Sequence, residues 1–385
     1  NVEYVSANPT GPMHVGHCRG AVVGDALANL LEAAGNTVTR EYYINDAGTQ
    51  VVALTWATYW RYLQVIGTEI SADDFSPLTP NGLQYQGEYL IPVARSIADK
   101  HGRTLANAEG GPADPSVWFE TVRRDALTQM MAAIREDLEA LGISHEVFAS
   151  EAETLASGRV DAAIAKLDSK GLLYEGVLEP PKGKMPEDWE ARPQTLFRST
   201  EFGDDQDRAL RKSDGTNTYF ANDIGYHAQK AANADVLIDV LGADHGGYVS
   251  RMRAAISALT DGKTGFEVVM CQIVRVVKNG EPVRMSKRAG TFVTLRDLLD
   301  EVGRDAVRFT MLTRKADAQM EFDLDAVVAQ TRDNPVFYVQ YAHARCRSVL
   351  RSAETMFGAD AVTSEALCSA DLSNLSSDVE LAVLR

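Results

Sequence analysis

The sequence predicts an α/β fold built on a parallel sheet, followed by an all-helical domain. Three observations lead to this expectation: a strand–helix–strand pattern over residues 2–44, a buried-type strand at 236–241, and a helical pattern after residue 294. Parallel strands are joined by helical crossovers, so alternating strands and helices indicate an α/β domain. At 385 residues the chain is long enough for two or three domains.

The first strand–helix–strand unit is defined by its breakers and its apolar stripe. Residues 2–7 are expected to form a short apolar strand, which an Asn-, Pro- and Gly-rich segment at 8–12 follows. We expect a helix from about His14 to Ala34, because its apolar residues recur at spacings of three and four. Residues 37–44 are rich in β-forming side chains and predict the next strand.

Helices and turns alternate through the rest of the chain. We expect an amphipathic helix over 51–66, a Gly- and Pro-rich insertion over 67–115, a helix over 116–141, another ending near Lys170, and a loop over 180–193. Asp214-Gly215 predicts a hairpin turn between two short strands, and Asn279-Gly280 predicts another between 268–277 and 282–285. Thr294 is expected to cap a helix with Asp297 at its third position, and from there to Arg385 the chain reads as all helix.

Composition narrows the class of protein. The chain is 45% apolar and 24% charged, which is ordinary for a soluble globular protein. It contains no run of 18 apolar residues, so a transmembrane helix is not expected. Its four cysteines include no CxxC pair, which disfavours a zinc knuckle and a disulfide framework and fits a reducing cytoplasm. With 38 basic against 54 acidic residues the net charge is −16, so any nucleic-acid contact needs a local basic patch.

Both ends of the chain resemble interior sequence. The first residues, from Val2 onward, read as a strand already under way with no initiator Met. The last residues, 379–385, stop inside a helix-like pattern. We therefore expect a fragment of a longer protein.

Two histidines lie at the start of the first predicted helix. His14 and His17 are three residues apart, so both face the N-terminal end of that helix, with Gly16 between them. A helix N-terminus attracts phosphate, imidazole donors can hold phosphate oxygens there, and Gly16 leaves room for a flat base. Taken alone, the residues also permit two surface histidines or a zinc pair, although no third ligand stands nearby. Neither a GxGxxG fingerprint nor a P-loop occurs.

A basic loop follows the second predicted hairpin. It runs from Arg284 to Gly290 and includes Met285, Ser286 and Lys287. Lys287 on such a loop is a mobile cation that can neutralise charge on a leaving pyrophosphate. A solvated basic loop is the alternative interpretation of this segment on its own.

Together the two motifs resemble the paired signature of class I aminoacyl-tRNA synthetases. Further stretches resemble the arginyl-tRNA synthetase family in order along the chain: residues 2–12, 45–48, 219–225, 242–245 and 334–342. The resemblance implies a Rossmann-like class I catalytic domain over residues 1–328, with an insertion at about 60–150. It also implies that residues 329–385 begin a helical anticodon-binding domain, and that the family's amino-terminal domain and last anticodon helices lie outside this chain.

The resemblance assigns roles to individual residues. The family's arginine-binding residues fall on Glu3, Asn8, Tyr219 and Asp223, a set that suits a planar cation favouring carboxylates and an aromatic face. Without the resemblance, Tyr219 reads as a core aromatic and Asp223 as a helix cap. Asp244 falls where class I enzymes reach the ATP ribose. The residues implied to contact ATP are His14, Gly16, His17, Asp244, Met285, Ser286 and Lys287, of which His14, His17 and Lys287 are implied to be catalytic.

The basic loop departs from the family pattern at two positions. The usual loop is Lys-Met-Ser-Lys-Ser, and here Arg284 replaces the first Lys and Arg288 the final Ser, while Lys287 is kept. We expect activation to remain possible, with the two arginines altering how the loop closes.

A local basic patch follows in the predicted helical domain. Arg345, Arg347 and Arg351 lie within residues 334–353, which contain no acidic residue. The patch is either the start of a tRNA-contacting surface or an ordinary charged helix face.

The resemblance implies a two-step reaction. The carboxylate of L-arginine attacks the α-phosphorus of Mg-ATP, and the arginyl group then passes to the terminal adenosine of tRNA(Arg). The implied partners are L-arginine, ATP with Mg²⁺, and tRNA(Arg), for a cytoplasmic monomer with no membrane contact and no protein-bound metal. A related nucleotidyltransferase, a cysteine or glutamate synthetase, and a non-catalytic synthetase-like RNA-binding fragment are the alternatives. Intact His14, His17 and Lys287 argue against decay of the site.

Overall fold

The computed structural model describes residues 1–178, 191–283, 294–331 and 334–384. The chain divides into two compact units, Asn1–Leu324 and Asp325–Arg385. The sequence analysis expects the domain boundary after residue 328. Each unit is described separately below.

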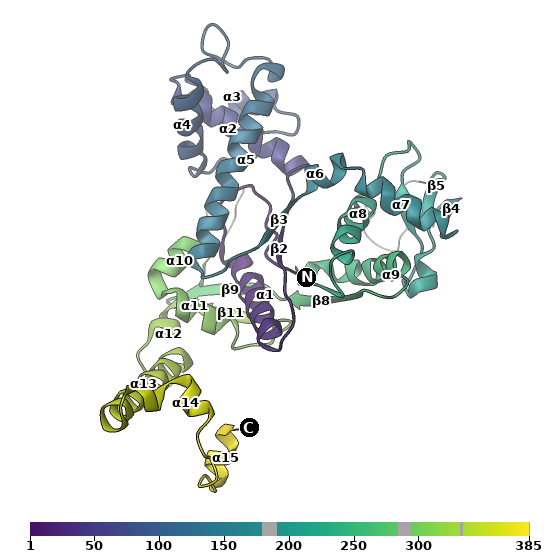
Figure 1. The fold of residues 1–385 in the computed structure, drawn as a ribbon. Coiled ribbons are helices and arrows are strands. Elements are labelled where there is room, and N and C mark those ends of the chain that lie inside the picture. Colours follow the sequence, from purple (N-terminus) through teal and green to yellow (C-terminus); the bar gives the residue numbers. More distant parts are fainter. Residues whose placement is uncertain (179–190, 284–293, 332–333, 385) are drawn as a thin grey trace. The chain divides into compact units, whose positions relative to one another are not determined.

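A five-stranded parallel sheet is the centre of the first unit (Figure 1). Its strand order is β3-β2-β1-β7-β8, which confirms the predicted α/β class. The strands are β1 (Val2–Glu3), β2 (Arg40–Ile44), β3 (Val147–Ser150), β7 (Val236–Gly242) and β8 (Gly265–Cys271). Helix α1 (Val15–Ala33) joins β1 to β2, so the predicted strand–helix–strand unit is confirmed. In the register, Val2 pairs with Arg40 on one side and with Ile238 on the other.

Two expectations about this sheet are wrong. The strand expected over 2–7 ends at Glu3, because Val5 and Ser6 adopt positive φ angles that no strand permits. Strand β3 was not predicted, although it forms the edge beside β2. The helix expected to end near Lys170 is α7 (Arg159–Ser169), and a shorter helix, α6 (Glu151–Ala156), precedes it.

Helices α2 to α5 form a bundle inserted between β2 and β3 (Figure 1). They are α2 (Thr49–Val65), α3 (Ala72–Phe75), η1 (Ser76–Leu78), α4 (Leu90–His101) and α5 (Pro115–Ala140). The predicted helices over 51–66 and 116–141 are confirmed, whereas α4 lies in a segment expected to be irregular. Aromatic packing holds the bundle: the Tyr59 and Trp118 rings stack with centroids 3.6 Å apart.

A helical layer and a small antiparallel sheet lie between β3 and β8 in the sequence. The antiparallel strands are β4 (Leu173–Gly176), β5 (Gln194–Phe197) and β6 (Arg208–Arg211), and the further helices are η2 (Ser199–Phe202), α8 (Tyr219–Ala231), η3 (Ala243–Tyr248) and α9 (Val249–Thr260). The turn at Asp214-Gly215 is confirmed, although Asn217 makes an isolated bridge to Arg211 and no second strand follows. Buried apolar side chains of α7, α8 and α9 form one core with β7. Most of the loop expected over 180–193 lies outside the described residues.

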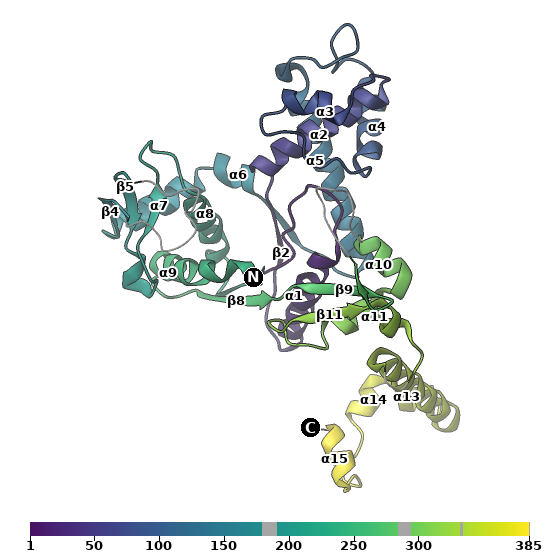
Figure 2. The same cartoon turned by 180° about the vertical axis from the view of Figure 1, so that it is seen from behind.

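A third sheet contains β9 (Val274–Lys278), β10 (Glu281–Pro282) and β11 (Met320–Asp323), and Figure 2 shows β9 and β11 side by side. The predicted turn is confirmed: Asn279 and Gly280 have φ angles of 53° and 77°, as a tight hairpin turn requires. The single strand expected over 268–277 is wrong, because the chain leaves the central sheet after Cys271 and begins β9 in another sheet at Val274. Thr294 caps α10 (Leu295–Val302) and exchanges hydrogen bonds with Asp297, also as predicted. After α11 (Arg304–Met311), however, β11 pairs in parallel with β9, so the expectation of unbroken helix is wrong.

The second unit is helical. It contains most of α12 (Leu324–Val328), then α13 (Pro335–Phe357), η4 (Ala359–Val362), α14 (Ser364–Cys368) and α15 (Asp378–Leu384). Asn334 caps α13 through its Oδ1, and its Nδ2 donates to the carbonyls of Val327 and Ala329 at 2.9 and 2.7 Å. Across the described residues, we find no helix with the length and apolar character needed to cross a membrane.

Candidate active site

Three strand ends meet at one edge of the central sheet. β1 lies between β2 and β7, and all three run parallel. Their carboxyl ends therefore lie side by side, which is where open parallel sheets bind ligands. Glu3 ends β1, Asp46 follows β2 and Asp244 follows β7, so acidic residues converge at this edge.

The turn after β1 is strained. Val5 and Ser6 have φ angles of 71° and 39°, and such a conformation costs a non-glycine residue about 1–3 kcal/mol. The Ser6 hydroxyl holds the turn by donating to Glu3 Oε1 at 2.9 Å and accepting from the Tyr43 N–H at 3.0 Å. The turn thereby fixes one carboxylate oxygen of Glu3. It leads into the loop that carries Asn8, which is partly buried.

The two predicted histidines cap the N-terminus of α1. The Gly16 N–H donates to His14 Nδ1 at 3.0 Å, and the His14 N–H donates to His17 Nδ1 at 3.3 Å. The rings stack with their centroids 3.9 Å apart. Because both Nδ1 atoms accept backbone hydrogen bonds, a neutral ring carries its proton on Nε2. The helix end therefore carries two imidazole rings at a position where phosphate is favoured.

Gly16 packs against the ring of His14. A Cβ at this position would lie 2.8 Å from His14 Cε1, so the ring would have to shift. The sequence analysis expected a flat base to occupy the space beside Gly16. In the structure, the imidazole of His14 occupies the side on which a Cβ would lie. Among the described residues, no group of three metal-ligating side chains includes His14 or His17.

The segment after the predicted Met-Ser-Lys loop lies beside His14. His14 and Thr294 form an antiparallel bridge, and the Leu295 N–H donates to the Met13 carbonyl at 2.8 Å. Asp137, near the end of α5, accepts from the Met13 N–H at 3.2 Å. The predicted loop itself lies outside the described residues, including Arg284, Met285, Ser286, Lys287 and Arg288.

Two of the predicted arginine-binding residues, Glu3 and Asp223, come together in the structure. Burial raises the pKa of the Asp223 carboxyl to about 7, against the opposing charges of His227 and Arg251. Glu151 and Glu3 add to this rise, so the three acids lie within electrostatic reach of one another.

Tyr219 lies at the first position of α8, one turn before Asp223, and is 55% exposed. The alternative interpretations of these two residues are therefore wrong. Tyr219 is not a core aromatic, and the cap of α8 is Thr218, whose hydroxyl accepts from the Ala221 N–H at 3.2 Å. Spacing of four residues places Tyr219 and Asp223 on one face of the helix.

The sequence analysis missed a further carboxylate, Glu151. It opens α6, is 9% exposed, and its buried Oε2 has no hydrogen-bond partner among the described residues. Burial first, and then the charge of Asp46, raise its pKa. Asp46 itself accepts from the Ser150 hydroxyl at 2.7 Å and from the Ala152 N–H at 2.8 Å. The available signal was the Ser150-x-x-Glu153 capping pattern, which places a helix start at Glu151 and a strand before it.

Four acidic side chains lie within electrostatic reach of the hydroxyl of Tyr43. Burial, followed by the charges of Glu151, Asp223, Glu3 and Asp46, raises the pKa of Tyr43 well above its usual range. Four carboxylates around one neutral hydroxyl make a strongly anionic site, which favours a cationic ligand.

One group of described residues has the geometry of a metal site. The ligand atoms of Glu3, His227 and Asp239 lie within 4.8 Å of one another. The ammonium of Lys230 already bonds two of them, at 2.7 Å from Glu3 Oε2 and 3.0 Å from Asp239 Oδ1. A metal ion would have to displace this ammonium from both carboxylates.

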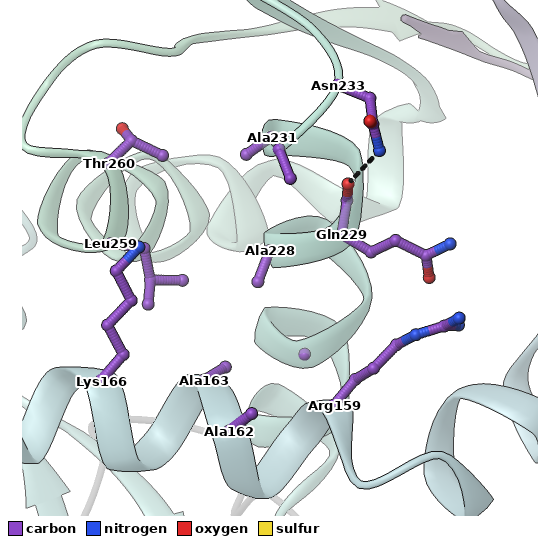
Figure 3. Close-up of a pocket in the computed structure, with 12 residues that line it drawn as sticks. Arg159, Ala162, Ala163, Lys166, Ala228, Gln229, Ala231, Asn233, Leu259 and Thr260 are labelled. Atoms are coloured by element: carbon purple, nitrogen blue, oxygen red, sulfur yellow. Dashed lines mark hydrogen bonds between the residues drawn. The ribbon is translucent and has the colours of Figure 1, made fainter.

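Two further features are not part of the group of acids that acts on Tyr43. Asp244, the predicted ribose contact, has a side chain that is 84% exposed and lies 3.7 Å from His245. A pocket of about 390 Å³ lies among α7, α8 and α9, where Figure 3 shows alanines of α7 and α8 together with Arg159 and Lys166. This pocket contains none of the predicted site residues.

Comparison with known proteins gives the class of the fold. Residues 1–77 match the family model described as tRNA synthetases class I (R), catalytic domain. The solved structure of Thermus thermophilus arginyl-tRNA synthetase shares the fold, with a TM-score of 0.65 at 20% identity over 91% of this chain and 64% of that chain. The parallel sheet with its histidine-capped first helix is thus the catalytic fold of a class I aminoacyl-tRNA synthetase.

Within that class, the chain belongs to the arginyl-tRNA synthetase family, as its motifs predict. It is 31% identical to the solved structure of a Campylobacter jejuni protein described as an arginyl-tRNA synthetase, with a TM-score of 0.75, over 98% of this chain and 75% of that one. It is 98% identical to the arginine–tRNA ligase of Gluconobacter oxydans and 58% identical to that of Methylobacterium sp. strain 4-46. Both matches cover the whole of this chain and 64% of the relative's length.

Proposed function

We propose that this chain carries the catalytic part of an arginine–tRNA ligase, which activates L-arginine with ATP and transfers it to tRNA(Arg). The observation that supports this most directly is the set of four carboxylates around Tyr43 at the carboxyl edge of the sheet. A cationic amino acid satisfies such a site, and arginine's planar guanidinium can pair with two carboxylates at once. Asp223 and Glu3 are the proposed partners of its charged groups, with Asn8 and Tyr219 beside the substrate.

In the first step, a carboxylate oxygen of arginine attacks the α-phosphorus of ATP, and the bond to pyrophosphate breaks. The products are arginyl-adenylate and pyrophosphate, and Mg²⁺ enters and leaves with the nucleotide. The Nε2–H groups of His14 and His17 donate to phosphate oxygens as charge builds, and Lys287 neutralises the leaving pyrophosphate. Gly16, Met285 and Ser286 contact the nucleotide, and Asp244 its ribose. Positioning and charge stabilisation supply the catalysis.

In the second step, a ribose hydroxyl of the terminal adenosine of tRNA(Arg) attacks the arginyl carbonyl, and AMP leaves. The arginines of α13 are proposed to approach the tRNA backbone, and Arg345 Nη1 lies 3.3 Å from the Tyr341 hydroxyl on the same exposed helix. We place the protein in the cytoplasm as a monomer.

Amino-acid-dependent exchange of pyrophosphate into ATP tests the proposal. All twenty amino acids are compared with and without tRNA(Arg), both for this chain and for the protein at the full length of its relatives. Exchange with arginine alone supports the function. Exchange with another amino acid refutes it, and RNA binding without any exchange favours the non-catalytic alternative.

A further inference from the structure

A buried network of charged side chains lies directly behind Glu3. Lys230 of α8 is 4% exposed, and its Nζ bonds Glu3 Oε2 at 2.7 Å and Asp239 Oδ1 at 3.0 Å. The Tyr226 hydroxyl lies 2.9 Å from the same Glu3 Oε2 and 2.6 Å from Glu41 Oε1. His227 Nε2 lies 2.9 Å from Asp239 Oδ2. The network thus joins strands β1, β2 and β7 to helix α8.

The charges of this network do not balance. Glu3, Glu41 and Asp239 supply three carboxylates and Lys230 one ammonium, which leaves two negative charges while His227 is neutral. Protonation of His227 still leaves one. An uncompensated buried charge is costly, so the network gains from one further cation. The groups that face it are Glu3, Glu41 and Asp239 from the strands, Asp223, His227 and Lys230 from α8, Tyr248 from η3, Arg251 from α9, and the side-chain amide of Asn1.

The two oxygens of Glu3 have different partners. Oε2 points into the network, where Lys230 and Tyr226 bind it. Oε1 accepts from the Ser6 hydroxyl in the strained turn, on the side of the strand-end edge. Without the ammonium, three buried carboxylates would repel one another. Glu3 would then lose its fixed orientation.

We propose that Lys230 is a positioning residue for the cationic substrate: it holds Glu3 through Oε2, so that Oε1 faces the arginine. This role rests on the proposed function. The substrate cation supplies the positive charge that the network lacks. A neutral amino acid does not supply it, so a cationic amino acid binds better. Lys230 therefore favours a cationic substrate without touching it.

The test compares Lys230→Met, which removes the charge and keeps the length, with the conservative Lys230→Arg. Lys166→Met, on the exposed face of α7, is the matched control. Arginine-dependent pyrophosphate–ATP exchange with tRNA present gives kcat and the KM values for arginine and ATP in the full-length protein at about pH 7. We expect Lys230→Met to raise the arginine KM roughly 10- to 100-fold at pH 7.

The ATP KM should stay unchanged, and Lys230→Arg should restore most of the arginine affinity. An unchanged arginine KM in Lys230→Met overturns the proposal. So does an equal loss for arginine and ATP, because that pattern marks a structural role. If Lys230→Met does not fold, the double variant Lys230→Met/Asp239→Asn keeps the network's net charge and should show the same loss of arginine affinity. A native protein without arginine-dependent exchange refutes the proposed function, independently of these variants.

Discussion

Replacing Asp223 by asparagine should weaken arginine binding and stabilise the empty protein. Burial raises the Asp223 pKa from 3.8 to about 7. A rise of about three units corresponds to about 4 kcal/mol for ionising the carboxyl in the empty site, and its residual contact with solvent reduces this to about 1–2 kcal/mol. Because the folded-state pKa is raised, the cost is absent below about pH 4, grows as the pH rises, and is complete above about pH 7. The variant should therefore unfold at a higher temperature than the native protein at pH 8, but not at pH 4.

Bound arginine reverses the effect of this charge. The ionised Asp223 carboxylate pairs with the guanidinium, and the amide of the variant leaves that cation poorly paired at a cost of about 2–5 kcal/mol. This equals a loss of roughly 30- to 4,000-fold in arginine affinity. In the native protein, arginine affinity should rise with pH and level off above about pH 7, because only the ionised carboxyl binds. The variant should lose that pH dependence.

Arginine- and lysine-dependent pyrophosphate exchange measures both effects when it is combined with thermal unfolding across the same pH range. Asp168→Asn, at an exposed position of α7, is the matched control and should change neither. Lysine should remain a poor substrate, because a point ammonium does not fill a planar fork. If Asp223→Asn keeps both its preference for arginine and the native pH profile, Asp223 is not the specificity residue. If the stability of Asp223→Asn at pH 8 does not exceed that of the native protein, ionising the Asp223 carboxyl in the empty site costs no free energy of folding.

Three further substitutions test other parts of the site. His17→Ala should reduce activation by roughly 10²–10³-fold, the scale of losing one transition-state donor, with little change in arginine binding measured by calorimetry; equal losses of both would indicate a structural residue. Lys287→Ala should lower kcat for activation far more than ATP affinity, because its partner charge develops on the leaving group; a normal rate with weaker ATP binding would contradict that role. Glu151→Gln should raise the arginine KM about tenfold and leave the ATP KM unchanged, since it removes one of the four acids around Tyr43. Glu153→Gln, exposed on the same helix, is its control, and equal KM values in the two variants would remove Glu151 from the site.

The sequence predicted local structure well where one strong signal acted alone. The stripe of α1, the cap at Thr294 and the Asn279-Gly280 turn each depend on neighbours within a few residues, and all three are confirmed. Strands β3 and β11 were missed because each is four residues long and is stabilised by pairing with a strand far away in sequence. No local pattern announces such a partner.

The strand at the centre of the site was overestimated for a related reason. Val2 to Ser6 have β-forming character, but the chain leaves the sheet after Glu3 because the Ser6 hydroxyl stabilises a backbone conformation that Val5 would avoid in isolation. Propensity yields here to tertiary hydrogen bonds at a functional edge, where strained residues are expected. These residues belong to the family motif, but the motif does not indicate that the backbone turns here.

The sequence predicted those residues of the candidate site that lie in short motifs and missed the others. His14, His17, Glu3 and Asp223 belong to such motifs, and the structure shows how their surroundings act on them. Lys230 belongs to none: it is one lysine on an amphipathic helix, and its effect appears only when α8 places it against two strands. A buried ammonium is costly in free energy unless it is paired with carboxylates. Lys230 pairs with Glu3 and Asp239 on neighbouring strands, so the burial of each of the three charges depends on the other two. The specificity of such a site resides in a charge balance over the whole sheet edge, and sequence order alone does not reveal which charges share it.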